Sequence, residues 1–259
     1  MQPTQLFEGI LTALAAQDEE LDGLLAGLDD AGWATPSRCP GWSIADVVLH
    51  LAQTDEMGQA SAEQRFSDAV RAFGNPAGAG PDATVDDLAG LAVEAQRGRP
   101  PAEVLQRWRA AAAAQRKALA ACEAGTRLPW VAGPLAALTL ATTRLAEHWI
   151  HTGDVADALG VAPLSTDRLQ PIARLAWRTL PYAFERSGRT LSGPVALHLT
   201  GPAGEPWEFT PDEPALTTVT GPALDFCLVA ARRVEPGATA LTASGPDAAA
   251  VLELVRTFA

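Results

Sequence analysis

The chain has 259 residues, enough for a full hydrophobic core and for two domains. Hydrophobic residues make up 47% of it and charged residues 19%, which is typical of ordered globular proteins and argues against intrinsic disorder. With 31 acidic and 19 basic residues the formal net charge is −12, so electrostatic repulsion argues against nucleic acid and anionic membranes as partners.

The N-terminal residues do not read as a secretory signal, because they lack a basic start and acidic residues interrupt their apolar positions. No apolar run approaches the roughly 20 residues that a membrane span needs. The three cysteines, Cys39, Cys122 and Cys227, are too few and too scattered for a disulfide framework or a cysteine-rich zinc site. We therefore expect a cytoplasmic protein, and either a monomer or a homodimer.

Helical periodicity predicts four long helices in the first part of the chain. Leucines and alanines recur at helical spacing over residues 5–28, and similar patterns predict helices over residues 44–73, from Pro101 onward and over residues 135–159. A Gly- and Pro-rich stretch, residues 74–87, predicts a loop between the second and third of them. Four helices of this length joined by short links indicate a bundle.

Boundary signals mark the second and fourth of these helices. Ser43 is a natural N-cap, and Asp46 lies three residues later, near the positive end of the helix dipole. Gly160 ends the fourth helix. A fifth helix is predicted over residues 166–186, after a link that contains proline.

The pattern changes after Ser187. The segments VALHLTG, AGEPWEFT, LTTVTG and ALTASG predict short strands, and PALDFCLVAARRV and DAAAVLELVRTFA predict two helices. This tail indicates a small α+β domain. The predicted fold class is therefore α+β, with a helical bundle over residues 1–165 and the connecting helix and small domain over residues 166–259.

The segment EHWIHTGDVADALG holds two of the four histidines. On a helix, Glu147 and His151 are four residues apart and lie on one face, with Arg144 and Asp154 on the same arc. Such a pair can bind one metal ion from a single rigid helix. The alternative interpretation is a plain intrahelical contact, with a salt bridge from Arg144 to Glu147 and with His148 as an ordinary residue.

His50 lies in the middle of the predicted second helix. Its face also carries Asp46, Thr54 and Met57, so this helix could line a polar cavity. If His50 joined the pair on the fourth helix, the three ligands would leave a coordination position open, as catalytic zinc requires. Spacing alone does not separate this hypothesis from a histidine that is merely hydrogen-bonded.

Two segments, CPGWSIADVVLHLAQTDE and TTRLAEHWIHTGDVADALG, resemble the DinB-like metal-binding proteins. More narrowly, they resemble the actinobacterial branch related to mycothiol-dependent maleylpyruvate isomerase, with its patterns GW-x-x-x-D-x-x-x-HL and E-x-x-x-H-x-x-D. The later stretches VTGPALDFCLVAARRV and LTASGP resemble the C-terminal domain of that family, which is similar in fold to sterol carrier proteins. The resemblance covers essentially the whole chain.

The resemblance implies that His50, Glu147 and His151 bind one divalent metal ion at a four-helix bundle. Zinc is the first candidate and nickel or iron are the others, with mycothiol as a thiol cosubstrate. We expect Asp154 and Asp46 to act as outer partners of the ligands.

Two arginines are candidate catalytic residues. In the isomerase a basic residue of the C-terminal domain assists catalysis, and the best matching position here is Arg232, with Arg233 next to it. We expect Arg232 and Arg144 to hold a carboxylate of a small-molecule substrate.

These features favour a metal-dependent enzyme, an isomerase or thiol S-transferase that acts on a small electrophilic metabolite. A metal-dependent hydrolase or cyclase of natural-product metabolism without a thiol is the first alternative. Two histidines and a carboxylate also bind iron in non-haem oxygenases, although that chemistry usually occupies a β-barrel. The sterol-carrier-like tail raises a third alternative, a non-catalytic small-molecule binding protein.

Overall fold

The computed structural model describes residues 2–73, 84–131 and 133–257. The chain divides into two compact units, Met1–Pro163 and Leu164–Ala259. The predicted domain boundary after residue 165 lies close to this division. None of the helices in the described part of the chain combines the length and the apolar character that crossing a membrane requires.

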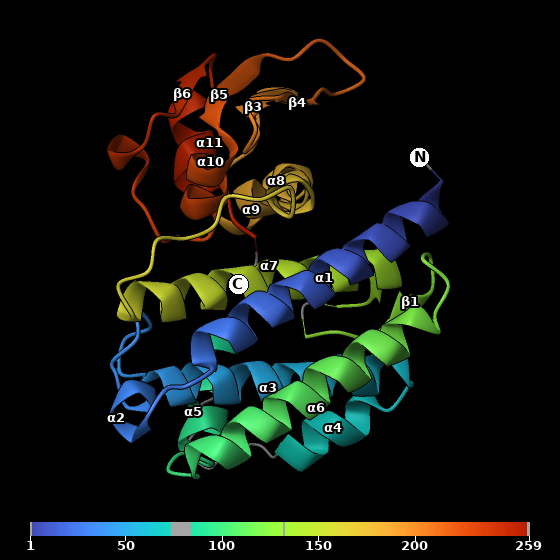
Figure 1. Cartoon of the computed structure of the whole chain (residues 1–259). Helices are drawn as coiled ribbons and strands as arrows, with labels where there is room; N and C mark the ends of the chain where they lie inside the picture. Colours follow the sequence, from blue (N-terminus) through green and yellow to red (C-terminus); the bar gives the residue numbers. More distant parts are fainter. Residues whose placement is uncertain (1, 74–83, 132, 258–259) are drawn as a thin grey trace. The chain divides into compact units, whose positions relative to one another are not determined.

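Four long helices form the bundle of the first unit (Figure 1). They are α1 (Pro3–Leu25), α3 (Ile44–Ala62), α6 (Pro101–Ala120) and α7 (Ala137–Ala158). Helix α1 packs against α7 and α3 packs against α6, while contacts of α3 with α7 and of α1 with α6 close the ring. Leucines on the inner faces, such as Leu14, Leu21 and Leu51, are completely buried. Burial of these apolar faces is what holds the bundle together.

Local sequence explains where these helices begin and end. Pro101 starts α6, where a missing amide proton costs nothing, and a run of alanines favours the helix that follows. Gly160 takes a φ of 68° just beyond α7, the left-handed conformation that ends many helices and that glycine adopts without strain.

Short elements connect the long helices of this unit. They are α2 (Asp30–Trp33), α4 (Phe66–Phe73), α5 (Val85–Glu94) and the paired strands β1 (Arg127–Leu128) and β2 (Leu135–Ala136).

The prediction of one helix over residues 44–73 is wrong in its length. Helix α3 ends at Ala62, because Gln64 takes a φ of 59°, a left-handed conformation that a helix cannot continue through. Most of the predicted loop over residues 74–87 lies outside the described residues. Its last part is helical instead, because Thr84 forms a capping box with Asp87 at the start of α5.

The second unit contains a four-stranded mixed sheet with helices packed on it. Its strands are β3 (Val195–Thr200), β4 (Pro206–Phe209), β5 (Thr217–Pro222) and β6 (Thr242–Ser244), in the order β4-β3-β5-β6. Strand β3 pairs parallel with β5, and the two outer pairings are antiparallel. This unit confirms the predicted α+β class.

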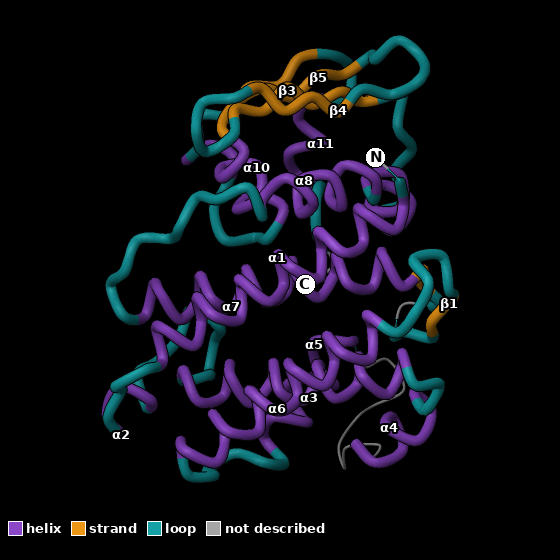
Figure 2. Tube along the Cα trace, turned by 45° about the vertical axis from the view of Figure 1, so that its right-hand side comes forward, coloured by secondary structure: helices purple, strands orange, loops and turns teal. Residues whose placement is uncertain are grey.

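Helices α8 (Leu169–Arg178), α10 (Ala223–Ala230) and α11 (Ala248–Leu254) pack on the sheet, and Figure 2 shows them on one side of it. The predicted helix over residues 166–186 is in fact two helices, α8 and α9 (Leu180–Arg186). Pro181 lies in the first turn of α9, where proline starts a helix more readily than it continues one.

Candidate metal centre

The donor set of the candidate site comes from two neighbouring helices of the first unit. His50 of α3 and Glu147 and His151 of α7 each place one donor atom within 4.8 Å of the other two. His50 Nε2 lies 3.0 Å from Glu147 Oε1, and the rings of His50 and His151 meet edge to face with centroids 5.1 Å apart. The structure thus brings together the three residues that were expected to bind metal. Helix packing, which spacing along one helix cannot reveal, adds His50 to the pair.

The surroundings favour the neutral form of His151 and the ionised form of Glu147, the protonation states that bind metal. Burial lowers the pKa of His151 below its ordinary value, although a hydrogen bond to Asp154 acts in the opposite direction. Burial opposes ionisation of Glu147, but the charge of Arg144 and a hydrogen bond from His50 outweigh it and hold the pKa of this carboxyl well below its usual range. A set of two imidazoles and one carboxylate fits a divalent ion of borderline softness such as zinc.

Asp154 is a hydrogen-bond partner of His151 on the same helix. Its carboxylate is almost completely buried and accepts a hydrogen bond from His151 Nδ1 at 3.0 Å. This bond places the proton on Nδ1 and leaves Nε2 as the nitrogen that can bind a metal. The arrangement supports the predicted role of Asp154.

Cys39 is a residue near the site that the sequence analysis missed. Its Sγ donates a hydrogen bond to Asp154 Oδ2 over 3.3 Å and lies 3.9 Å from His151 Nδ1. Cys39, His151 and Asp154 thus form a second group of potential ligands that shares His151 with the first. The sequence analysis considered cysteines only as disulfide or zinc-cluster partners. The position of Cys39 just before the helix that carries His50 could have indicated that its thiol lies near the site.

A tight turn explains how the loop before α3 reaches the site. The Trp42 amide donates to the Cys39 carbonyl at 3.0 Å, with Pro40 and Gly41 between them and a φ of 78° at Gly41. This is the pattern of a type II turn, which requires glycine at its third position. The turn directs Cys39 toward Asp154, while the Trp42 ring packs on His50 with centroids 5.1 Å apart.

Asp46 has contacts that support a helix-capping role. Its carboxylate accepts hydrogen bonds from the Ser43 amide and hydroxyl, each at 2.8 Å, and Arg97 Nε donates to it at 3.0 Å. Ser43 Oγ in turn accepts from the Asp46 amide, which completes a capping box. Asp46 therefore fixes the start of the helix that carries His50, a different role from the expected one beside the metal ligands.

Arg144 lies behind Glu147 and is completely buried. Its guanidinium donates to Glu147 Oε2, and to Thr54 Oγ1 and Asp55 Oδ1, both at 2.9 Å. The salt bridge to Glu147 is the alternative that spacing had left open. A buried guanidinium that already pairs with two carboxylates is poorly placed to bind a third one from a substrate, which argues against the predicted catalytic role of Arg144.

Arg232, the second predicted catalytic arginine, follows α10 in the second unit. It takes a φ of 60°, and the amides of Arg232 and Arg233 donate to the carbonyls of Val229 and Leu228. These two bonds form a Schellman motif, in which glycine usually occupies the position of Arg232. Burial lowers the pKa of Arg232, and the neighbouring charge of Arg256 lowers it further. Its role in catalysis stays a prediction.

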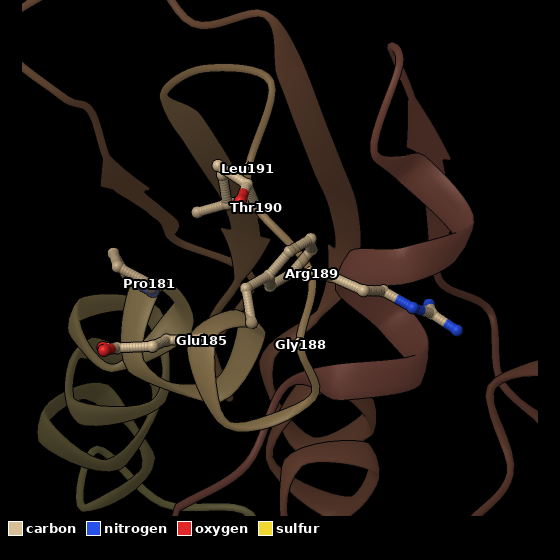
Figure 3. Close-up of a pocket in the computed structure, with 7 residues that line it drawn as sticks. Pro181, Glu185, Gly188, Arg189, Thr190 and Leu191 are labelled. Atoms are coloured by element: carbon tan, nitrogen blue, oxygen red, sulfur yellow. The ribbon is translucent and has the colours of Figure 1, made fainter.

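A pocket of about 390 Å³ lies in the second unit, where α9 leads toward the sheet (Figure 3). Pro181, Phe184 and Leu191 contribute apolar surface, and Glu185 adds a carboxylate. The guanidinium of Arg189 points away from the other labelled side chains, and Glu253 holds it with two hydrogen bonds of 2.8 and 3.1 Å. The lining contains none of the residues of the candidate metal centre.

Comparisons with known proteins agree with this architecture. Residues 14–156 match the family described as the mycothiol maleylpyruvate isomerase N-terminal domain. Two proteins of Mycobacterium tuberculosis, uncharacterized protein MT0041 of strain CDC 1551 / Oshkosh and uncharacterized protein Rv0036c of strain ATCC 25618 / H37Rv, are each 37% identical to this chain. Each alignment spans 250 residues, 95% of this chain and 93% of the relative.

Two crystal structures share the fold. Mycothiol-dependent maleylpyruvate isomerase matches with a TM-score of 0.61 at 17% identity, over 92% of each chain. A histidine-to-alanine variant of that enzyme matches with a TM-score of 0.60 at 16% identity, over 91% of this chain and 92% of the variant. Identities this low support the fold alone, whereas the family match covers more than half of the sequence. The chain therefore belongs to the family of the mycothiol maleylpyruvate isomerase N-terminal domain.

Proposed function

We propose that this protein binds one divalent metal ion, zinc by preference, and catalyses a thiol-dependent isomerisation or thiol transfer on a small electrophilic metabolite. The observation that carries the proposal is the meeting of His50, Glu147 and His151, one donor atom from each within 4.8 Å of the others. Mycothiol is the proposed thiol, because the structural neighbours are named as mycothiol-dependent isomerases.

A metal held by two imidazoles and one carboxylate, with an open position, lowers the pKa of a bound thiol or water and polarises an electrophile. The residues of this chain prepare that site. Asp154 orients His151, Trp42 packs on His50, and only 8% of His50 and 7% of His151 is exposed to solvent. Such burial strengthens electrostatic interactions at the site and limits competition from bulk water.

Elemental analysis of the purified full-length protein tests the metal. We expect about one zinc ion per chain in the wild type, loss of that ion in His50→Ala, and retention in His198→Ala. The second variant is a matched control, because His198 is an exposed histidine of the sheet in the other unit. Protein that is grown and purified with ample metal yet carries none would rule out the proposal.

The thiol needs its own test. Mycothiol should raise the thermal midpoint of the metal-loaded wild type and leave that of His50→Ala unchanged, since ligands stabilise the state that they bind. Turnover should then appear with mycothiol and an unsaturated electrophile. Metal binding without any response to mycothiol would shift the proposal to a thiol-free hydrolase or cyclase, and bound iron with oxygen consumption would shift it to an oxygenase.

A further inference from the structure

A line of charged side chains runs from Glu147 across the whole bundle, and we call it the buried charge network. It consists, in order of contact, of Glu147, Arg144, Asp55, His148, Asp18 and Arg116. Acidic and basic side chains alternate along it, and each of the four long helices contributes at least one member. This pattern differs from a set of independent surface ion pairs.

Asp55 is the centre of the network. Its Oδ1 accepts hydrogen bonds from Arg144 at 2.9 Å, from His148 Nε2 at 2.8 Å and from Gln115 Nε2 at 2.6 Å. The side chains of Asp55, Arg144 and His148 are all 0% exposed. Three donors that converge on one fully buried oxygen fix the position of each donor.

His148 extends the network to the opposite helix. Its Nδ1 lies 2.6 Å from Asp18 Oδ1, while its Nε2 faces Asp55. Each ring nitrogen of His148 thus faces a carboxylate oxygen, one from α1 and one from α3, so this side chain connects the two helices. Asp18 also accepts from Arg116 of α6, which ends the line near the surface.

Gly58 of α3 leaves the space that the Gln115 side chain occupies. A Cβ atom at Gly58 would lie 2.0 Å from Gln115 Oε1. The glycine near the C-terminal end of α3 therefore lets the Gln115 side chain pass and reach Asp55. Glycine is unfavourable inside a helix, so its presence here indicates that the contact offsets the loss of helix stability.

Stability alone is a weak explanation for such a network. Burying charges carries a desolvation cost that often exceeds their mutual attraction, and apolar side chains of similar volume would stabilise a bundle as well or better. The end of the network at Glu147 suggests a role at the metal site instead. Arg144 donates to Glu147 Oε2, while Oε1 lies 3.0 Å from His50 Nε2.

We propose that the buried charge network keeps Glu147 Oε2 bonded to Arg144, so that this carboxylate binds the metal through Oε1 only. A coordination position then stays open for the reactants. Arg144, Asp55, His148 and Asp18 are then positioning residues. This inference rests on the proposed function, because it assigns a purpose to these residues only if Glu147 binds a metal ion.

The test uses the full-length protein with Co²⁺ or Zn²⁺ as the probe and compares Asp55→Asn with Glu56→Gln. The two substitutions are neighbours on α3 and each converts a carboxylate to its amide. Glu56 pairs with Arg107 of α6, outside the buried charge network. Glu56→Gln therefore controls for the loss of a carboxylate on this helix, and a difference in metal binding between two folded variants isolates the network.

We expect Asp55→Asn to bind Co²⁺ roughly 10–100-fold more weakly than the wild type, the range typical of lost support for a metal ligand, because Arg144 then loses the carboxylate that positions it against Glu147. Its visible absorption should also weaken, because a second oxygen of Glu147 raises the coordination number of Co²⁺. Glu56→Gln should keep the wild-type dissociation constant and spectrum. Arg144→Lys retains the charge but cannot reach both Asp55 and Glu147, so its affinity and spectrum should resemble those of Asp55→Asn. If Asp55→Asn does not fold, Arg144→Lys provides the test.

The outcomes separate the two proposals. A wild type that binds neither Co²⁺ nor Zn²⁺ overturns the proposed function and this inference with it. A wild type that binds metal, together with folded Asp55→Asn or Arg144→Lys proteins of unchanged affinity and spectrum, overturns only the positioning role. An equal loss of affinity in Glu56→Gln also overturns it, because general destabilisation would then explain the result.

Discussion

The thiol of Cys39 and the Nδ1 of His151 both donate to one oxygen of Asp154, over 3.3 and 3.0 Å. Asp154 and His151 lie on α7, whereas Cys39 comes from the turn before α3. This shared oxygen therefore connects the two segments that supply the candidate ligands. An ionised carboxylate with two donors is held in one orientation, and it holds the His151 ring in turn.

Removing the charge of Asp154 should weaken metal binding without abolishing the fold. Asp154→Asn keeps the shape of the side chain but accepts less strongly from His151 Nδ1, so we expect the dissociation constant for Zn²⁺ to rise roughly 10–100-fold. Competition with a chelator of known affinity measures this change. Asp157→Asn, at an exposed position of the same helix, should leave the constant unchanged. Equal constants in wild type and Asp154→Asn would contradict the outer-partner role.

Replacing Cys39 should not change the number of bound metal ions. The thiol donates to Asp154 in the structure, which assigns Cys39 to orientation of that carboxylate rather than to metal binding. We expect Cys39→Ser to retain one metal ion per chain, because serine can donate the same hydrogen bond. The Co²⁺ form should lack a sulfur-to-metal charge-transfer band in both proteins. A band that is present in the wild type and absent from Cys39→Ser would show instead that the group Cys39, His151 and Asp154 binds metal.

The fold class and the candidate pair on α7 could be predicted from sequence, because both depend on periodicity along one segment. Glu147 and His151 are one helical turn apart, and that spacing is independent of how helices pack. The roles of Asp18, Asp55 and Cys39 depend on contacts between segments distant in sequence, which periodicity does not encode. Arg144 is an example. Its position on the same helical arc indicated that it lies near Glu147, but its ion pair with buried Asp55 became visible only in the structure.

Helix boundaries show a similar limit. The hydrophobic pattern continues through residues 62–66, so periodicity predicts an uninterrupted second helix. The structure instead ends α3 at Ala62, with a left-handed residue at Gln64, a glutamine that has no strong turn preference. Ser43 and Asp46 are the opposite case, because a capping box requires only residues three apart and is visible in the sequence.

Cys227 should be unreactive in the native protein. Burial raises the pKa of its thiol well above the ordinary value, and the side chain is completely inaccessible. The thiolate is the reactive form, so a raised pKa lowers the reactive fraction at every pH below that value. Labelling with a chromogenic disulfide reagent at pH 8 should therefore modify Cys227 only after unfolding in denaturant. Rapid native labelling that disappears in Cys227→Ser would show that this part of the second unit opens readily.

Arg232→Gly should make the protein more stable and less active. Arg232 holds a left-handed φ of 60° at a position where helices usually place glycine, and its charge lies near that of Arg256. Removing the backbone strain should add about 1 kcal/mol to the free energy of unfolding of the second unit, measured by chemical denaturation. Loss of the guanidinium should lower turnover in the thiol-plus-electrophile reaction while metal content stays the same.

Arg232→Ala is the matched comparison for this variant. It also removes the guanidinium but keeps a Cβ in the left-handed conformation, so it should lose the same activity without gaining the same stability. Wild-type turnover in both variants would exclude Arg232 from the reaction. Equal free energies of unfolding for the two variants would mean that backbone strain at this position does not destabilise the protein. A strained arginine where glycine fits better is the pattern expected of a side chain that serves activity at the expense of stability.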